Sequence, residues 1–233
     1  MPVERKLFVC LVAIIAAVVV GCRGRATRVK PTKGFGMMFN FPPVEGTPAP
    51  VPPPGYFVRA ASSLSEPDAK IEIPRGVDTI LYESELAIVI GTRARRVSEA
   101  GAAACIAGYT CGMDGSPLIL DANGERDAAR SIAGKSFDGV APVGTQLVTK
   151  LAPGGHEVVL RVNGEEVDRS NTRDLIWQPE RIVSEISQKV TLEPGDVIFC
   201  GANKAVPKMR PGDVVEVEIS GIGVMRNEVV AAP

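Results

Sequence analysis

Two glutamates stand in an apolar run that reads Leu81-Tyr82-Glu83-Ser84-Glu85-Leu86-Ala87-Ile88-Val89-Ile90-Gly91. Because successive side chains of a β-strand point to opposite faces, Glu83 and Glu85 lie on the same face if this run is a strand. Two neighbouring carboxylates can share one divalent cation, whereas without a cation they would repel each other. Exposed strands also carry glutamates at this spacing, so the pair alone leaves two interpretations open, a metal site and a solvated strand face.

Short apolar runs rich in β-branched residues continue from Tyr56 towards the end of the chain, separated by Gly, Pro and Asp. This pattern is typical of a strand-rich domain. Asn163-Gly164 favours a tight hairpin, and two Pro-Gly-Asp turns, at 194–196 and 211–213, each precede a valine-rich run. We predict strands at 79–90, 106–112, 146–150, 157–162, 166–169, 197–200 and 214–220.

Two helices are predicted among these strands. Ser98 can cap a short alanine-rich helix that runs to Cys105, with Glu99 in its first turn. Pro179 opens a second helix with three aliphatic side chains on one face. Two helices against seven strands do not form repeated β–α–β units. We therefore predict an α+β fold that is mostly β, a mixed β-sheet sandwich or roll with few helices.

The composition excludes some classes of function. The chain has 233 residues, of which 45% are hydrophobic, and 26 basic side chains balance 27 acidic ones. Such a balance provides no basic surface for phosphate backbones, so we expect no binding to nucleic acid. The single histidine, His156, excludes a site built from several imidazoles, and we interpret it as a surface residue. The chemistry is therefore expected to depend on carboxylates and lysine.

The N-terminal segment resembles a secretory signal. Arg5 and Lys6 precede an uncharged apolar run at 7–20, which a glycine and Cys22 follow. The run is short for a membrane span, and its end resembles the lipobox of bacterial lipoproteins. We expect a signal peptide at 1–21, lipidation of Cys22 and a lipid-anchored, extracytoplasmic protein of the bacterial cell envelope. An uncleaved anchor helix is the alternative.

Residues 22–54 are expected to form a tether that begins at the lipidated cysteine. Eight prolines lie between residues 23 and 54, and all the basic residues there precede Glu45, the first acidic one. Proline-rich segments are semi-extended and form no packed core. The basic cluster can lie against anionic lipid head groups or can be merely solvated. The folded domain is expected at 55–233.

Three further cysteines, Cys105, Cys111 and Cys200, lie in apolar runs. Their number allows at most one disulfide among them. We interpret them as buried small hydrophobic residues, in preference to a disulfide or a nucleophile.

Two other segments carry residues that could take part in binding or catalysis. Asp114 ends the apolar run Gly108-Tyr109-Thr110-Cys111-Gly112-Met113-Asp114 and can supply a third oxygen ligand, and Lys135 begins Lys135-Ser136-Phe137-Asp138-Gly139. From about Tyr56 to Val229 the sequence resembles the fumarylacetoacetate hydrolase family, whose members carry six such segments in this order. The other segments here are Tyr82-Glu83-Ser84-Glu85-Leu86-Ala87, Asn163-Gly164-Glu165, Leu192-Glu193-Pro194-Gly195-Asp196 and Pro211-Gly212-Asp213-Val214-Val215 with Gly221-Ile222-Gly223.

The resemblance implies a fold of the fumarylacetoacetate hydrolase type and one Mg²⁺ or Mn²⁺ held by Glu83, Glu85 and Asp114. Oxygen ligands suit such hard cations. The implied activity is hydrolysis, decarboxylation or isomerisation of a small 2-oxo or enol carboxylic acid, with an enolate stabilised by the metal. Lys135 matches the catalytic lysine that faces the substrate; a solvated lysine paired with Asp138 is the alternative. The family is commonly dimeric, so a homodimer is also expected.

The sequence departs from the family pattern at three places. Leu118 stands where an arginine is typical, and Ala202 stands where a Gly-Thr-Pro turn has its threonine. The histidine that hydrolytic members carry upstream of the metal strand has no counterpart here. The substrate pocket is therefore expected to be altered. Two alternatives to the enzyme stay open, a non-catalytic membrane-anchored binding or structural lipoprotein and a metal-free protein.

Overall fold

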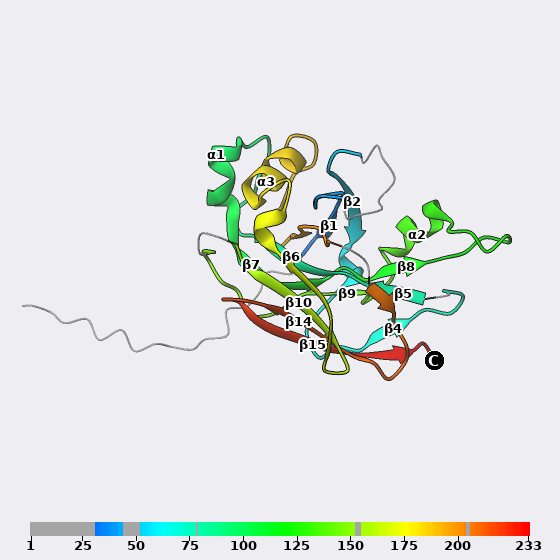
Figure 1. The fold of residues 1–233 in the computed structure, drawn as a ribbon. Coiled ribbons are helices and arrows are strands. Elements are labelled where there is room, and N and C mark those ends of the chain that lie inside the picture. Colours follow the sequence, from blue (N-terminus) through cyan, green and yellow to red (C-terminus); the bar gives the residue numbers. More distant parts are fainter. Residues whose placement is uncertain (1–30, 44–51, 78, 152–154, 204–205) are drawn as a thin grey trace, which may run out of the picture.

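The structure is a computed structural model that describes residues 31–43, 52–77, 79–151, 155–203 and 206–233 (Figure 1). Over these residues the chain is mostly β with few helices, which confirms the predicted α+β class. The helices are α1 Glu99–Ala102, α2 Ala128–Gly134 and α3 Pro179–Ser187, with 3-10 turns at Ala61–Ser63, Ala103–Cys105 and Thr172–Asp174. The strands are β1 Lys33–Met38, β2 Gly55–Ala60, β3 Leu64–Ser65, β4 Ile71–Ile73, β5 Thr79–Tyr82, β6 Ser84–Ile90, β7 Ile106–Met113, β8 Ser116–Leu118, β9 Ala141–Pro142, β10 Glu157–Val162, β11 Glu165–Asn171, β12 Val197–Phe199, β13 Val206–Lys208, β14 Val214–Ile219 and β15 Gly223–Ala231.

Two five-stranded sheets pack face to face. One has the strand order β2-β1-β12-β6-β7 and the other β11-β10-β14-β15-β4. Each sheet contains one parallel pair among antiparallel ones, so both are mixed. In Figure 1, β6 and β7 lie above β10, β14 and β15, and one cluster of buried side chains joins the two layers. The helices α1 and α3 lie together at one end, and α2 lies beside β8 on the other side.

The β2-β1-β12-β6-β7 sheet has one face towards the main core and one face away from it. Glu85 lies on the face away from the core. Cross-strand partners share a face, and the register aligns Gly36 with both Phe57 and Phe199 and then Phe199 with Ala87. Glu85 lies two residues before Ala87 on β6 and so points to this same side. The opposite side faces the main core. Both faces of this sheet are therefore packed with apolar side chains, and the face away from the main core carries Glu85 beside a smaller apolar cluster that includes Ala87 and Phe199.

The predicted strand at 79–90 is in fact two strands. Thr79–Tyr82 pairs with β13 and β8 in a small sheet, whereas Ser84–Ile90 lies inside the large sheet, and Glu83 lies between them. The predicted strand at 146–150 is wrong, because the described chain there forms only a single bridge, between Tyr109 and Val148. The predicted hairpin turn is confirmed, with Asn163 and Gly164 at positive φ.

The expected tether is wrong at residues 33–38, and the folded domain therefore includes residues before the predicted start at 55. Residues 33–38 form β1 inside the large sheet, where Phe35 is fully buried. Lys33 Nζ lies 2.6 Å from the buried carboxylate of Asp196, which holds the start of β1 beside β12. The prediction failed because β1 contains glycines and stands beside a proline-rich stretch. At Gly36 a Cβ atom would lie only 2.8 Å from Asp114 Oδ2, so this strand needs glycine where it passes the site.

The two predicted helices are present, and a third was not predicted. Ser98 caps α1 through the amide of Gly101, and Pro179 is the first residue of α3, as expected. The additional helix, α2, begins after Asp127, whose side chain accepts from the amide of Arg130. It was missed because its residues 128–134 show no apolar periodicity. This helix matters for the site, since Lys135 follows directly at its end.

The predictions for the N-terminus lie outside the described residues. The signal peptide at 1–21 and the lipidated Cys22 both fall in this part of the chain. Over the residues that the structure describes, no helix has the length and apolar character to cross a bilayer.

Candidate metal centre

Three carboxylates converge on one side of the large sheet. Glu83 lies between β5 and β6, Glu85 lies on β6, and Asp114 directly follows β7. One oxygen from each residue can be chosen so that all three lie within 4.8 Å of one another. Glu85 and Asp114 are buried, and Glu83 is partly exposed. The structure therefore brings together the three residues that were predicted as metal ligands; that they bind a metal stays a prediction.

Backbone pairing sets this convergence. Strands β6 and β7 are antiparallel, with Glu85 opposite Gly112, so the end of β7 reaches the start of β6. The Asp114 amide then donates to the Glu83 carbonyl at 2.8 Å. On the other side, the Gly201 amide after β12 donates to Glu85 Oε2. Each acidic side chain is thus placed by the sheet itself, which holds a site more rigidly than flexible loops would.

Lys135 lies among the acidic residues and not in solvent. Its Nζ donates to Glu83 Oε2 at 2.6 Å and to Asp114 Oδ1 at 2.7 Å. Only 5% of the residue is exposed, and the ammonium lies 5.2 Å from the centre of the Phe57 ring. The alternative of a solvated lysine paired with Asp138 is therefore wrong, because Lys135 is buried and its carboxylate partners are Glu83 and Asp114.

A second cation, Arg59 on β2, was not predicted. Its guanidinium is fully buried, forms an ion pair with Asp114, and donates to the carbonyls of Lys135 and Gly115. No motif in the sequence singles it out, since it lies in the run Gly55-Tyr56-Phe57-Val58-Arg59-Ala60. The available signal was an arginine in a run that is otherwise apolar or small, because a buried arginine needs an acidic partner.

The buried charges shift one another's ionisation. Burial, and then repulsion by Glu83, raise the pKa of Glu85 from 4.5 to about 8. Burial lowers the pKa of Lys135, while Glu83 opposes this effect. Burial also lowers the pKa of Arg59, to about 10. Burial is thus the main reason why the Glu85 carboxyl keeps its proton to a higher pH, and the neighbouring Glu83 carboxylate adds to the effect.

The other residues noted in the sequence lie around or away from this centre. Leu118 is partly buried on β8, and Ala202 directly follows Gly201, the partner of Glu85. The three cysteines are buried and free, as predicted. His156 is buried, not on the surface as expected, and its Nδ1 contacts the carbonyl of Ser220. Two glycines precede His156 in the sequence, which had indicated an exposed position. In the fold, His156 lies against Ser220, the residue that follows β14.

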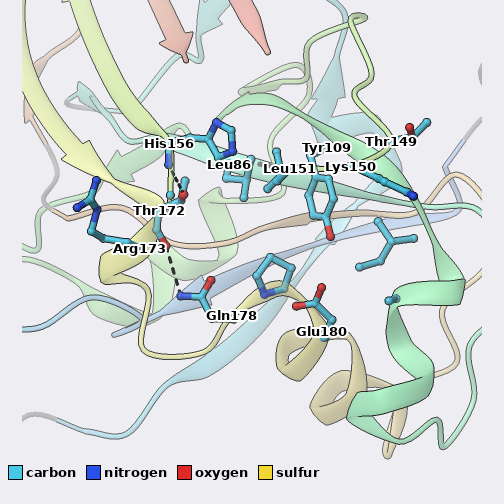
Figure 2. Close-up of a pocket in the computed structure, with 14 residues that line it drawn as sticks. Leu86, Tyr109, Thr149, Lys150, Leu151, His156, Thr172, Arg173, Gln178 and Glu180 are labelled. Atoms are coloured by element: carbon cyan, nitrogen blue, oxygen red, sulfur yellow. Dashed lines mark hydrogen bonds between the residues drawn. The ribbon is translucent and has the colours of Figure 1, made fainter. Parts of the chain in front are cut away.

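A cavity lies on the opposite side of β6 from the carboxylates. It has a volume of about 640 Å³, and Leu86 lines it, next in sequence to Glu85 but on the other face of the strand. In Figure 2, Tyr109 and Glu180 point towards each other across it and His156 lies at its edge. Burial, and then Glu180, raise the pKa of Tyr109 to about 12. This cavity is therefore separate from the acidic centre.

A comparison with family models identifies the chain. The model described as fumarylacetoacetate (FAA) hydrolase, C-terminal, matches residues 21–230. The chain belongs to this fumarylacetoacetate hydrolase family. The match begins before β1, in agreement with the structure, in which β1 is part of the domain.

Relatives with named activities are enzymes on small carboxylic acids. Human mitochondrial oxaloacetate tautomerase FAHD2B is 36% identical over 192 residues, which cover 78% of this chain and 60% of that protein. The structure of 5-carboxymethyl-2-hydroxymuconate delta-isomerase from Mycobacterium smegmatis superposes with a TM-score of 0.78 at 32% identity, covering 88% and 81% of the two chains. Maleylpyruvate hydrolase from Sphingobium sp. SYK-6, solved with manganese(II) and pyruvate, has a TM-score of 0.73 at 28% identity, covering 88% and 72%.

Proposed function

We propose that this chain is a divalent-metal-dependent enzyme that hydrolyses, decarboxylates or isomerises a small 2-oxo or enol carboxylic acid. The observation that carries the proposal is the convergence of Glu83, Glu85 and Asp114 around a buried lysine. Among the relatives described above, one is a tautomerase, one an isomerase and one a hydrolase with bound manganese and pyruvate. Their activities favour an enzyme over the alternative of a non-catalytic lipoprotein.

The residues present fit a hard divalent cation. The donor set is three carboxylates, the ligand type that Mg²⁺ and Mn²⁺ prefer, and one oxygen of each lies within 4.8 Å of the others. When bound, such an ion would supply Lewis-acid stabilisation to a substrate oxygen that gains negative charge. Glu83, Glu85 and Asp114 would hold it, with the Gly201 amide and Arg59 keeping Glu85 and Asp114 in place.

Lys135 is the proposed catalytic residue. Its ammonium can offset the charge of a substrate carboxylate or enolate, and an ammonium with a lowered pKa can also transfer a proton from Nζ. The ammonium is buried against the Phe57 ring, and charge interactions are stronger in such a buried site than in water. Ala202 beside Gly201 offers no hydroxyl to a substrate, so the backbone and Lys135 are left to orient it.

The proposal is tested by turnover with and without metal. We expect the purified protein to catalyse oxaloacetate tautomerisation or acylpyruvate hydrolysis with Mn²⁺ or Mg²⁺, and to lose this activity after EDTA treatment. Activity should return when either ion is added back. Turnover that EDTA leaves unchanged, or equal turnover by wild type and a Glu83→Ala/Glu85→Ala variant, would contradict the proposed function.

The pH dependence of metal binding provides a separate prediction. Because Glu85 must lose its proton to bind a cation and its pKa is raised to about 8, Mn²⁺ affinity should increase with pH up to about 8 and then level off. Below that pH the increase should approach about tenfold per unit, with one proton released. Calorimetry in buffers of different ionisation enthalpy measures both quantities. An affinity that is constant between pH 6 and pH 8 would contradict a metal site in which Glu85 must first lose a proton with a pKa of about 8.

We further propose that Cys22 carries a lipid that anchors the protein to the bacterial envelope, because a signal-like apolar run ends directly before it. Expressed in a bacterial host, the wild type should incorporate labelled palmitate and sediment with membranes, and Cys22→Ser should do neither. Equal labelling and fractionation of the two proteins would count against the anchor.

A further inference from the structure

Two buried cations face the three carboxylates, and the structure holds them in different ways. Arg59 has several fixed partners: the Asp114 carboxylate and the carbonyls of Lys135 and Gly115. Its guanidinium also lies 5.4 Å and 5.6 Å from the centres of the Phe57 and Phe199 rings. A planar guanidinium held at this many points, with no exposed surface, cannot leave without disrupting the sheet.

Among the described residues, the hydrogen bonds of the Lys135 ammonium go to oxygens that the proposed metal would need, and its other close contact is the Phe57 ring, whose centre lies 5.2 Å from Nζ. Its hydrogen-bond partners are Glu83 Oε2 and Asp114 Oδ1, which belong to two of the three candidate ligands. The Lys135 backbone is fixed, because its amide donates to Ile132 at 3.1 Å and its carbonyl accepts from Arg59. The side chain beyond it is a flexible four-carbon stem that can change rotamer. Lys135 can therefore move its charge while its main chain stays in place.

We propose that Lys135 acts as a displaceable counter-ion, whose ammonium neutralises Glu83 and Asp114 in the metal-free protein and leaves Glu83 when a divalent cation enters. Released from Glu83, the ammonium becomes available to a substrate carboxylate or enolate. Metal loading thus places the catalytic lysine, and a lysine bound to its own carboxylates stays unreactive until the centre is complete. The inference rests on the proposed function in taking the three carboxylates as the metal site.

Lys135 is expected to weaken metal binding in two ways. Its hydrogen bonds occupy Glu83 and Asp114 oxygens, so a cation must break them to bind. Its positive charge also stays within a few ångströms of the entering cation, where repulsion in a buried site is strong. Removing the ammonium should therefore strengthen metal binding, although the same residue is needed for turnover. A lysine that merely helped to build the metal site would give the opposite result.

The test compares Mn²⁺ binding to wild type and Lys135→Met after removal of metal with EDTA. We expect the dissociation constant from calorimetry or Mn²⁺ electron paramagnetic resonance to fall at least tenfold in the variant. The metal-free variant should melt at a lower temperature than metal-free wild type, because three carboxylates lose a counter-ion, and Mn²⁺ should raise its melting temperature more. The matched control is Lys189→Met, an exposed lysine after α3, which should leave the affinity unchanged.

A second variant covers the case in which metal-free Lys135→Met does not fold. Lys135→Gln removes the charge but keeps an amide that can donate to one carboxylate, and it should also bind Mn²⁺ more tightly than wild type. Equal or weaker binding by the folded variant would overturn the displaceable counter-ion and leave the metal centre standing. Absence of Mn²⁺ binding by wild type and variants alike would overturn the proposed function as well.

Discussion

Glu85→Gln is expected to lower metal-dependent turnover at least a thousandfold, although it changes one oxygen to a nitrogen. Glu85 is buried, and its carboxylate accepts a hydrogen bond from the Gly201 amide. The side-chain oxygen of a glutamine can accept the same hydrogen bond. The substitution therefore removes a charged ligand and preserves the packing. A thousandfold loss corresponds to about 4 kcal/mol of transition-state stabilisation, the order expected when a metal ion is lost or misplaced. Steady-state kinetics at saturating Mn²⁺ measure it.

The same variant should make the metal-free protein more stable at alkaline pH. Since the pKa of Glu85 is raised from 4.5 to about 8, the native state keeps a proton that the unfolded chain has already lost between these values. Wild type therefore loses stability as pH rises through this interval, and Glu85→Gln does not. At pH 9 we expect the variant to be more stable by about 1–3 kcal/mol in urea unfolding.

The exposed Glu228 on β15 provides the matched control. Glu228→Gln should leave turnover unchanged. If Glu85→Gln kept more than a tenth of the activity, or if it unfolded more easily than wild type at pH 9 without metal, our account of Glu85 as a charged ligand under electrostatic strain would be wrong.

Arg59→Met is expected to lower the free energy of unfolding by about 3–5 kcal/mol. The substitution keeps the length and apolar contacts of the side chain between Phe57 and Phe199, but it leaves Asp114 with one buried counter-ion and two carbonyls without their donor. Losing one partner of a buried ion pair typically has a cost of this size. Urea unfolding of the metal-free protein measures it.

Arg95→Met provides a control for Arg59→Met. Arg95 also donates to two backbone carbonyls, those of Ser187 and Gln188, but it lies away from the acidic centre and is only partly buried. Arg95→Met should cost about 1 kcal/mol or less. Mn²⁺ should restore part of the stability lost in Arg59→Met, because a divalent cation supplies positive charge beside Asp114. A loss below 1 kcal/mol for Arg59→Met would contradict the role of Arg59 as counter-ion.

The acidic residues of the site could be predicted from the sequence because each belongs to a local motif. Glu83 and Glu85 are two positions apart at the start of an apolar run, and Asp114 ends another such run. Antiparallel pairing of those runs is sufficient to bring the carboxylates together. Lys135 followed from the family resemblance, whereas its two carboxylate partners depend on the position of α2, which no periodicity had indicated.

Arg59 and β1 could not be predicted because the features that define them are tertiary. Arg59 is a single arginine whose partners lie more than fifty residues away in sequence. Residues 33–38 contain two glycines beside a proline-rich stretch, which local propensity treats as linker. In the fold, Gly36 allows β1 to pass against Phe57 and Asp114, where a side chain would not fit. Close packing against a distant element has no signature in a single sequence.

The most direct test of the central claim is a crystal structure of the protein soaked with Mn²⁺, with the ion located by its anomalous scattering. We expect one strong peak directly bonded to an oxygen each of Glu83, Glu85 and Asp114, with Lys135 Nζ no longer hydrogen-bonded to Glu83. A peak bound elsewhere, or an anomalous map without a peak between the three carboxylates at saturating Mn²⁺, would contradict this claim.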